Sequence, residues 1–281
     1  MTFTQTPLDR VRAYWDARPC NIRHSPLPVG TREYFDEVEA RKYRVEPHIP
    51  RFAEFERWNG ARVLEVGCGI GTDTINFARA GAHVTAVDIS AKSLELAQRR
   101  AEVYGLANRI NFVQGDAEHL FDVLKVAAYD LVYSFGVIHH TPHPDRAMAQ
   151  IATYYVRPGT ELRLMVYNRD SWKALGIWLS RFYRGTDLFA SIDDLIARYS
   201  EAQTGCPVTY TYTRESVRRR LLGAAFKVQS ITREHIFPYR VSDYVEYRYV
   251  KALPWSITPG PVMRWLEHQL GWHLCVKAVA R

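Results

Sequence analysis

The chain has 281 residues, of which 47% are hydrophobic and 13% aromatic, and its formal net charge is +7 at pH 7. This length and composition suit one α/β core with residues to spare, and they exclude an intrinsically disordered chain. The most apolar segment near the middle, Trp172 to Phe189, is interrupted by charged residues, so we expect no transmembrane helix. The basic residues are scattered, so the charge permits an anionic partner without indicating one.

The cysteines and the first residues bear on the cellular compartment. Cys20, Cys68, Cys206 and Cys275 are not spaced as zinc-binding or redox pairs, so we expect free thiols in a reducing cytoplasm. The first ten residues lack a basic stretch followed by an apolar one, so the sequence predicts no signal peptide. Both features favour a cytoplasmic location.

In chain order, residues 1–59 are predicted to be helical. Leu8, Val11 and Trp15 share one face at helical spacing before Pro19 ends that segment. A second helix is expected from Glu33 to Glu46, and a third follows around residues 49–55. We expect residues 1–59 to form a helical cap segment that precedes a main domain at 60–281.

From residue 60 onward, short apolar strands alternate with helices. A helix is predicted at 91–104, with Ser90 as its N-cap and Gly105 just past its end, and another starts after Pro144. This alternation predicts an α/β fold with a doubly wound, mostly parallel seven-stranded sheet. Cap insertions are predicted at about 170–212 and 237–271, and shorter helices at 193–199 and 214–222. The predicted strands are 62–66, 83–87, 110–113, 130–133, 161–167, 226–232 and 273–280.

A glycine-rich stretch, VLEVGCGIGTD, follows the first predicted strand. Gly67, Gly69 and Gly71 stand at alternate positions, where the backbone can turn sharply and approach a ligand that a Cβ would strike. The following helix offers free N–H groups and the positive end of its dipole. A nicotinamide-binding fingerprint would need glycine at position 72, which is Thr72, so the spacing disfavours a dinucleotide.

Here the sequence resembles the class I S-adenosylmethionine (SAM)-dependent methyltransferases, in particular the type 11 group that includes quinone-biosynthesis methyltransferases. The resemblance is strongest over 61–167, and it implies a Rossmann-like fold, methyl transfer and SAM as the cofactor. It assigns the glycine-rich loop to the amino acid and ribose of SAM, Asp88 in AVDIS to the ribose hydroxyls, and Asp116 in QGDAEHL to the adenine. The cofactor-binding residues expected on this basis are Glu65, Gly67, Cys68, Gly69, Gly71, Asp88, Ile89, Asp116, Ala117 and Ser134.

The stretch SFGVIHHTPH follows the fourth predicted strand and, in the resembling family, faces the transferred methyl group. A histidine there could remove a proton from an attacking hydroxyl or amine. His139 and His140 are the catalytic candidates, with His140 preferred, and a packing role weighs equally. A metal site made from these two and His143 is disfavoured because no carboxylate accompanies them, so we expect no metal ion.

Aromatic residues of the cap segments could wall an apolar substrate, although packing within the cap is the simpler interpretation for each ring. Tyr14, Arg23 and Tyr167 are the candidates for contacting the substrate. We predict methyl transfer from SAM to a small or medium-sized molecule at an oxygen, nitrogen or carbon atom. The enzyme's main work would be to align donor and acceptor and to exclude water.

Two other functions stay open. A nucleic acid (RNA) methyltransferase would use the positive charge, but the tetrapeptide typical of enzymes that methylate base amines is missing after the fourth strand, which argues against a nucleic acid partner. A SAM-binding protein with chemistry other than methyl transfer is the second alternative, because a fold does not fix a function. Val262, Trp265, Leu266 and Gln269 could also make peripheral contact with a membrane, though such residues more often pack on the sheet edge.

Overall fold

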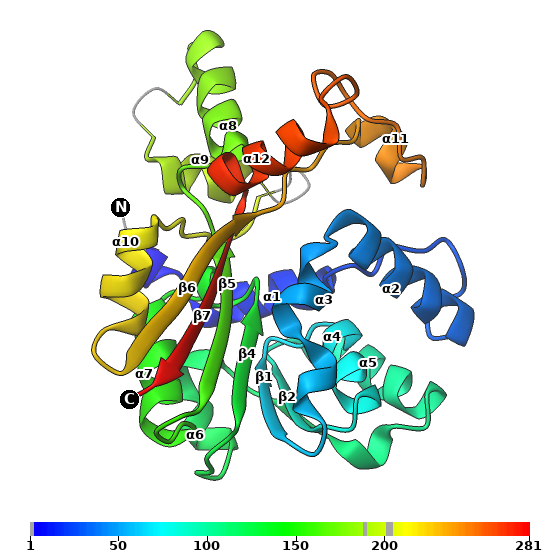
Figure 1. Cartoon of the computed structure of the whole chain (residues 1–281), viewed down its shortest axis with the longest axis vertical. Coiled ribbons are helices and arrows are strands. Elements are labelled where there is room, and N and C mark those ends of the chain that lie inside the picture. The colour runs from blue at the N-terminus through cyan, green and yellow to red at the C-terminus, as the bar shows by residue number, and fades with distance from the viewer. Residues whose placement is uncertain (1–2, 188–189, 201–204) are drawn as a thin grey trace.

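A seven-stranded sheet in the order β3-β2-β1-β4-β5-β7-β6 forms the centre of the molecule (Figure 1). The structure, a computed structural model, describes residues 3–187, 190–200 and 205–281. Five neighbouring strands are parallel, and β7 runs antiparallel between β5 and β6. The predicted doubly wound, mostly parallel sheet is therefore confirmed. The strands are β1 (Arg62–Val66), β2 (His83–Asp88), β3 (Ile110–Gln114), β4 (Leu131–Phe135), β5 (Glu161–Tyr167), β6 (Phe226–Glu234) and β7 (His273–Ala280).

Helices cover both faces of the sheet, because successive strand residues point to opposite sides. In β1, Val63 packs in the core under α4 (Thr72–Arg79) and α5 (Ala91–Val103), whereas Leu64 packs in the core under α6 (Leu120–Val123) and α7 (Pro144–Tyr154). The predicted N-cap is present, since the Ser90 side chain accepts a hydrogen bond from the Ser93 N–H, and the helix expected after Pro144 includes Pro144 as its first residue.

Three N-terminal helices lie beside and above the carboxyl ends of the parallel strands. They are α1 (Leu8–Ala17), α2 (Arg32–Val45) and α3 (His48–Ala53). Val11 of α1 is buried in the core, while Leu8 and Trp15 on the same face line a pocket. The apolar face of α2 is buried through Tyr34, Phe35 and Val38.

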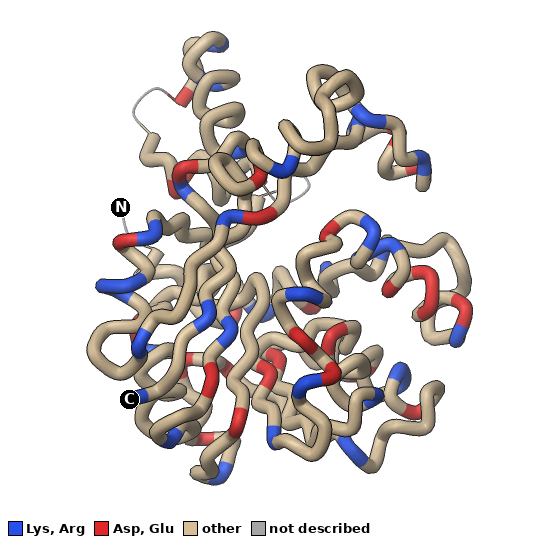
Figure 2. Tube along the Cα trace, in the orientation of Figure 1, with Lys and Arg blue, Asp and Glu red and all other residues tan. Residues whose placement is uncertain are grey.

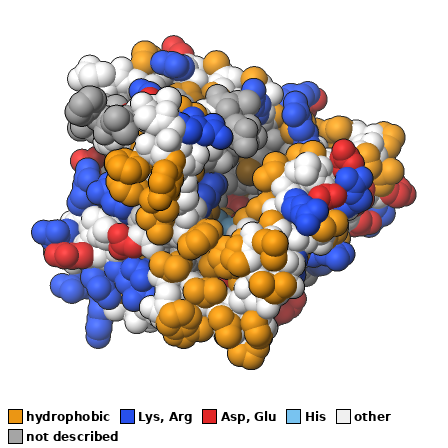
Figure 3. Space-filling model, turned by 90° about the horizontal axis from the view of Figure 1, so that it is seen from above, with side chains coloured by type: hydrophobic (Ala, Val, Ile, Leu, Met, Phe, Trp, Pro, Cys, Tyr) orange, Lys and Arg blue, Asp and Glu red, His pale blue; other side chains and the backbone are white. Residues whose placement is uncertain are grey.

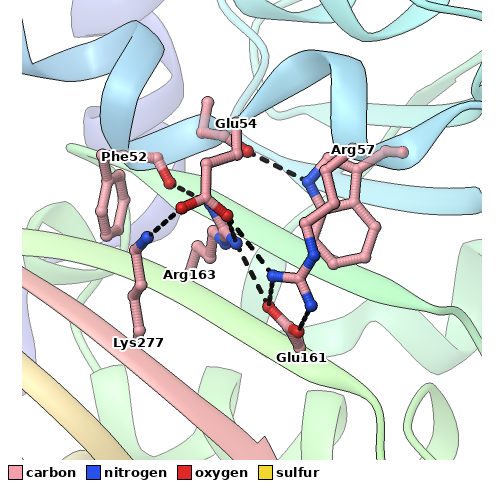
Figure 4. A network of polar contacts seen from close by, with 8 residues as sticks. Phe52, Glu54, Arg57, Glu161, Arg163 and Lys277 are labelled. Carbon is pink, nitrogen blue, oxygen red and sulfur yellow. Dashed lines mark hydrogen bonds and ion pairs between the residues drawn. The ribbon is translucent and has the colours of Figure 1, made fainter.

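An ionic network fixes the end of α3 to the sheet (Figure 4). The fully buried Arg163 of β5 donates hydrogen bonds to the Phe52 carbonyl and the Glu54 carboxylate, and Lys277 of β7 lies 2.7 Å from Glu54. Burial raises the pKa of Glu54, but the hydrogen bonds from Lys277 and Arg163 outweigh it and lower the pKa to about 2. Arg57 and Glu161 complete the network, which holds the N-terminal segment in place.

A helical cap stands beyond the carboxyl ends of the strands (Figure 1). It contains α8 (Trp172–Tyr183), α9 (Ile192–Tyr199), α11 (Val241–Val245) and α12 (Gly260–Leu270). Large apolar side chains are exposed on this side of the molecule (Figure 3), among them Trp178 and Phe182 of α8 and Trp265 of α12. Within the described residues, no helix is both long and apolar enough to span a membrane.

Two parts of the predicted cap differ from the expectation. Val208, Tyr210 and Tyr212, inside the expected insertion at 170–212, lie in the main core rather than outside the sheet, because this segment returns beside the end of β5, where Asn168 pairs with Tyr212. The helix expected at 214–222 is one turn, α10 (Arg214–Ser216), followed by a π-helical segment at Val217–Leu222.

Candidate active site

A pocket opens at the carboxyl ends of β1, β2 and β4, and residues of α1 and of the last turn of α2 also line it. In a doubly wound sheet, ligands bind in the crevice outside these strand ends. Eight of the ten predicted cofactor residues line it. They are Glu65, Gly67, Cys68, Gly69, Asp88, Ile89, Asp116 and Ala117.

The other two predicted cofactor residues, Gly71 and Ser134, do not line the pocket. Gly71 has φ +76° at the start of α4, and a Cβ there would lie 3.1 Å from the Ala97 Cβ, so this glycine allows α4 and α5 to pack closely. Ser134 is fully buried and donates its hydroxyl to the Val66 carbonyl, 2.9 Å away. Their positions indicate structural roles at the edge of the site.

The glycine-rich loop has the tight turn that the sequence predicts. Gly67 has φ +84°, and a Cβ on it would lie 2.1 Å from a methyl carbon of Val137. Both the backbone conformation and the lack of space therefore exclude a side chain at this position. Gly69 has φ +54° and donates its N–H to Asp88, at 2.8 Å. The loop therefore presents bare backbone to the pocket.

Asp88 ends β2 with both carboxylate oxygens held by backbone N–H groups. One oxygen accepts from Gly69 and the other from Ser90, at 2.8 and 2.9 Å. Burial raises the pKa of Asp88 to about 6 against these hydrogen bonds. A carboxylate has about four acceptor sites, so two stay available for ligand hydroxyls.

Asp116 precedes the 3₁₀ turn at Ala117–His119 and also borders the pocket. Its carboxylate accepts from the Glu118 N–H at 3.0 Å and lies 2.7 Å from Nδ1 of His119. These contacts orient Asp116 while leaving acceptor capacity for an amino group.

A further acidic residue of the pocket, Asp73, was not singled out from the sequence. Asp73 accepts hydrogen bonds from Lys42 at 2.7 Å, Tyr43 at 2.9 Å and Tyr133 at 2.8 Å. Burial, and then the nearby Asp73 charge, raise the pKa of Glu65 to about 8. The Lys42 ammonium is therefore paired with the Asp73 carboxylate, and Glu65 beside them keeps its proton at neutral pH.

Of the residues that sequence reasoning missed, Asp73 had a local signal and Lys42 had none. Asp73 closes the glycine-rich stretch and lies in the first turn of α4, where an acidic side chain is favoured by the helix dipole. Lys42 reaches the pocket from α2, which is distant in sequence.

His140 lines the pocket, whereas His139 lies behind it. Nδ1 of His140 is 2.9 Å from the Val208 carbonyl. Because a carbonyl can only accept, Nδ1 carries the proton, which leaves Nε2 as the basic nitrogen. His139 is fully buried without a hydrogen bond to its ring among the described residues, and burial, then the charge of His140, lower its pKa well below the usual value.

The predicted substrate-contacting residues are spread around this site and do not line the pocket. Tyr14 packs edge-on against its neighbour Trp15, which does line it. Arg23 is exposed, and its carbonyl accepts from the Tyr247 hydroxyl at 3.2 Å. Tyr167, at the end of β5, has its ring centre 4.0 Å from that of His139, with the two rings tilted by 50°.

Comparison with known proteins identifies the central part of the chain. Residues 63–159 match the family described as "Methyltransferase domain". These residues are a class I SAM-dependent methyltransferase domain. This domain contains the glycine-rich loop, Asp88, Asp116 and His140, and the cofactor of its class is SAM.

The curated relatives match this chain over part of its length. A ubiquinone biosynthesis O-methyltransferase from Aromatoleum aromaticum is 33% identical over 111 residues, which cover 40% of this chain and 46% of the relative. The chain spans less than half the length of these curated relatives.

Solved structures share the fold over nearly the whole chain. Magnesium protoporphyrin IX methyltransferase from Synechocystis PCC 6803, solved with bound S-adenosylhomocysteine, has a TM-score of 0.61 at 17% identity and covers 98% of this chain and 100% of its own. The cyclase SpnF has a TM-score of 0.53 at 18% identity, with 99% and 93% covered. These similarities confirm the Rossmann-like fold.

Proposed function

We propose that this protein transfers the methyl group of SAM to a small or medium-sized acceptor. The observation that carries the proposal is the convergence of the glycine-rich loop and Asp88 on one pocket, where the Gly69 N–H is bonded to the Asp88 carboxylate. Because this hydrogen bond joins the loop to Asp88, the backbone of the glycines and the Asp88 carboxylate, which can bind hydroxyl groups, would contact the same nucleoside.

The charge of the pocket supports SAM over a dinucleotide. Asp73, Asp88 and Asp116 all border it, against Lys42, the one lysine or arginine among its lining residues. SAM presents a sulfonium and an ammonium group, which these carboxylates would attract, whereas the pyrophosphate of a dinucleotide would be repelled. Lys42, paired with Asp73, is suited to the methionine carboxylate.

When bound, SAM supplies an activated methyl group, so the protein's own residues have to position the acceptor and manage its proton. We assign proton removal to Nε2 of His140, because the Val208 carbonyl fixes the proton on the other ring nitrogen. His139, buried and neutral, would support the ring of His140, which lies 4.1 Å from it. If Tyr14, Arg23 and Tyr167 contact the acceptor, they would do so from outside the pocket lining.

The partners and location follow from the same proposal. Lys and Arg residues are interspersed with Asp and Glu over the molecule (Figure 2), which supports a small-molecule acceptor over a nucleic acid. The cysteines are free thiols, three of them buried, which supports a cytoplasmic location.

The test is turnover with methyl-labelled SAM and a panel of small hydroxyl, amine and activated-carbon acceptors, read out as S-adenosylhomocysteine. His140→Ala should lower kcat by about 10²–10⁴-fold with SAM affinity nearly unchanged, as for loss of a general base. The matched control, His83→Ala, removes an exposed histidine at the start of β2 and should leave kcat unchanged. SAM binding without S-adenosylhomocysteine formation from any acceptor would contradict methyl transfer and favour other SAM chemistry.

A further inference from the structure

Three histidines and a glutamate meet at the edge of the sheet, next to the pocket. Glu46 follows the last residue of α2, His48 begins α3, His235 follows β6, and His273 begins β7. The pairing of Glu234 with His273 brings the last two segments together. None of these residues belongs to the methyltransferase domain at 63–159.

The ligand atoms of this cluster have the spacing of a metal site. One oxygen or nitrogen from each of Glu46, His235 and His273 lies within 4.8 Å of the others. Nε2 of His273 is 3.7 Å from a Glu46 oxygen, which is too long for a hydrogen bond. Metal–ligand bonds of about 2.0–2.2 Å in tetrahedral geometry separate neighbouring ligand atoms by roughly 3.4 Å, so a small contraction would complete the site.

His48 orients the His273 ring in the way that metal ligands usually need. Its Nε2 lies 3.0 Å from Nδ1 of His273, and both side chains are buried. When His273 donates from Nδ1 to His48, its Nε2 lone pair points to Glu46. A second histidine nitrogen held by such an outer partner is a regular feature of protein metal sites.

His235 adopts a backbone conformation that few residues other than glycine accept. Its φ is +69°, and within the described residues its ring has no hydrogen bond, only ring contacts such as the one with His273 at 4.8 Å. Glu46 and His235 are only partly buried, which gives an ion a way in.

From this geometry we propose that Glu46, His235 and His273 bind one divalent transition metal ion of the zinc class, with His48 positioning His273. Two histidines and one carboxylate are a ligand set that zinc accepts, and three protein ligands leave one coordination position open. This revises the sequence-based expectation of no metal, which considered only His139, His140 and His143.

The site adjoins the pocket without sharing its residues. The His273 ring lies 5.6 Å from that of Phe135, which lines the pocket. Glu46 also lies one helical turn beyond Lys42, which lines the pocket. A bound ion would therefore fasten the end of α2 to β6 and β7, beside the pocket.

The test is a titration of chelator-treated full-length protein with Co²⁺, followed by its visible absorption, and then competition with Zn²⁺. We expect one ion per chain. His235→Ala and Glu46→Gln should each weaken binding at least about 100-fold, and His48→Ala about 10- to 100-fold. His268→Ala, which removes an exposed histidine of α12, is the matched control and should bind as the wild type does.

Two results would overturn the proposal: no saturable binding by the wild-type protein, or equal affinity in wild type and Glu46→Gln. Circular dichroism would show whether His235→Ala folds, and if it does not, Glu46→Gln decides the question. Since the titration uses neither SAM nor acceptor, a failure here would leave the proposed methyl transfer standing.

Discussion

Glu65 is a buried carboxyl whose protonation should be visible in the stability of the protein. It is 3% exposed, burial raises its pKa to about 8, and the Thr74 hydroxyl donates to it at 2.5 Å. Glu65→Gln keeps the shape and an acceptor oxygen for Thr74 but removes the titration. The variant therefore isolates the effect of burying this one acid.

The sign follows from the proton balance. Between about pH 4.5 and about pH 8 the folded protein keeps this proton and the unfolded chain releases it, so the free energy of unfolding falls as pH rises. The slope for one proton is about 1.4 kcal/mol per pH unit, which amounts to roughly 3 kcal/mol between pH 4.5 and pH 7. Glu65→Gln should match the wild type near pH 4.5 and be about 3 kcal/mol more stable at pH 7.

Urea unfolding at pH 5, 6, 7 and 8 measures this directly. The difference in free energy of unfolding between variant and wild type should grow with each step up to about pH 8. Glu56→Gln, which replaces an exposed carboxyl, is the control and should show no such growth. A constant difference between Glu65→Gln and wild type across the series would refute the assignment of a buried proton to Glu65.

Two further substitutions test the loop and the carboxylate beside it. Gly67→Ala should lower the free energy of unfolding by roughly 2–5 kcal/mol, because of the positive φ and the collision with Val137. The control is Gly159→Ala, where φ is +93° and no atom lies within 4 Å of the added Cβ, so it should lose only the backbone part of about 1–2 kcal/mol. Equal losses of the two variants in urea unfolding would refute the collision with Val137. Asp88→Asn should weaken SAM binding by about 1–3 kcal/mol, or roughly 5- to 150-fold, measured by calorimetry. An unchanged dissociation constant would exclude Asp88 from the ribose site.

Much of the site could be predicted because its signals are local. The glycines, Asp88 and Asp116 lie at or just past the ends of three successive strands, and the carboxyl ends of parallel strands meet at one edge of a sheet. Strand alternation and helix caps likewise depend on neighbouring residues, so the sheet, Ser90 and Pro144 could be located from sequence.

The remainder depends on contacts between distant segments. Nothing near Lys42 in sequence indicates that it faces Asp73, and His48 and His273 are far apart in the chain. Within a helix such as α1, the side chains of adjacent residues point about 100° apart. Trp15 therefore lines the pocket while Tyr14 does not, and a count of cap aromatics could not choose between them.

The central claim is that the pocket bordered by Gly67, Gly69 and Asp88 holds an adenosine linked to a methionine chain. Isothermal titration of the full-length protein with S-adenosylhomocysteine, and in parallel with NAD, tests it most directly. The account predicts one S-adenosylhomocysteine per chain, with a dissociation constant on the order of micromolar, and no heat with NAD. Binding of NAD in its place, or no heat from S-adenosylhomocysteine, would contradict the account.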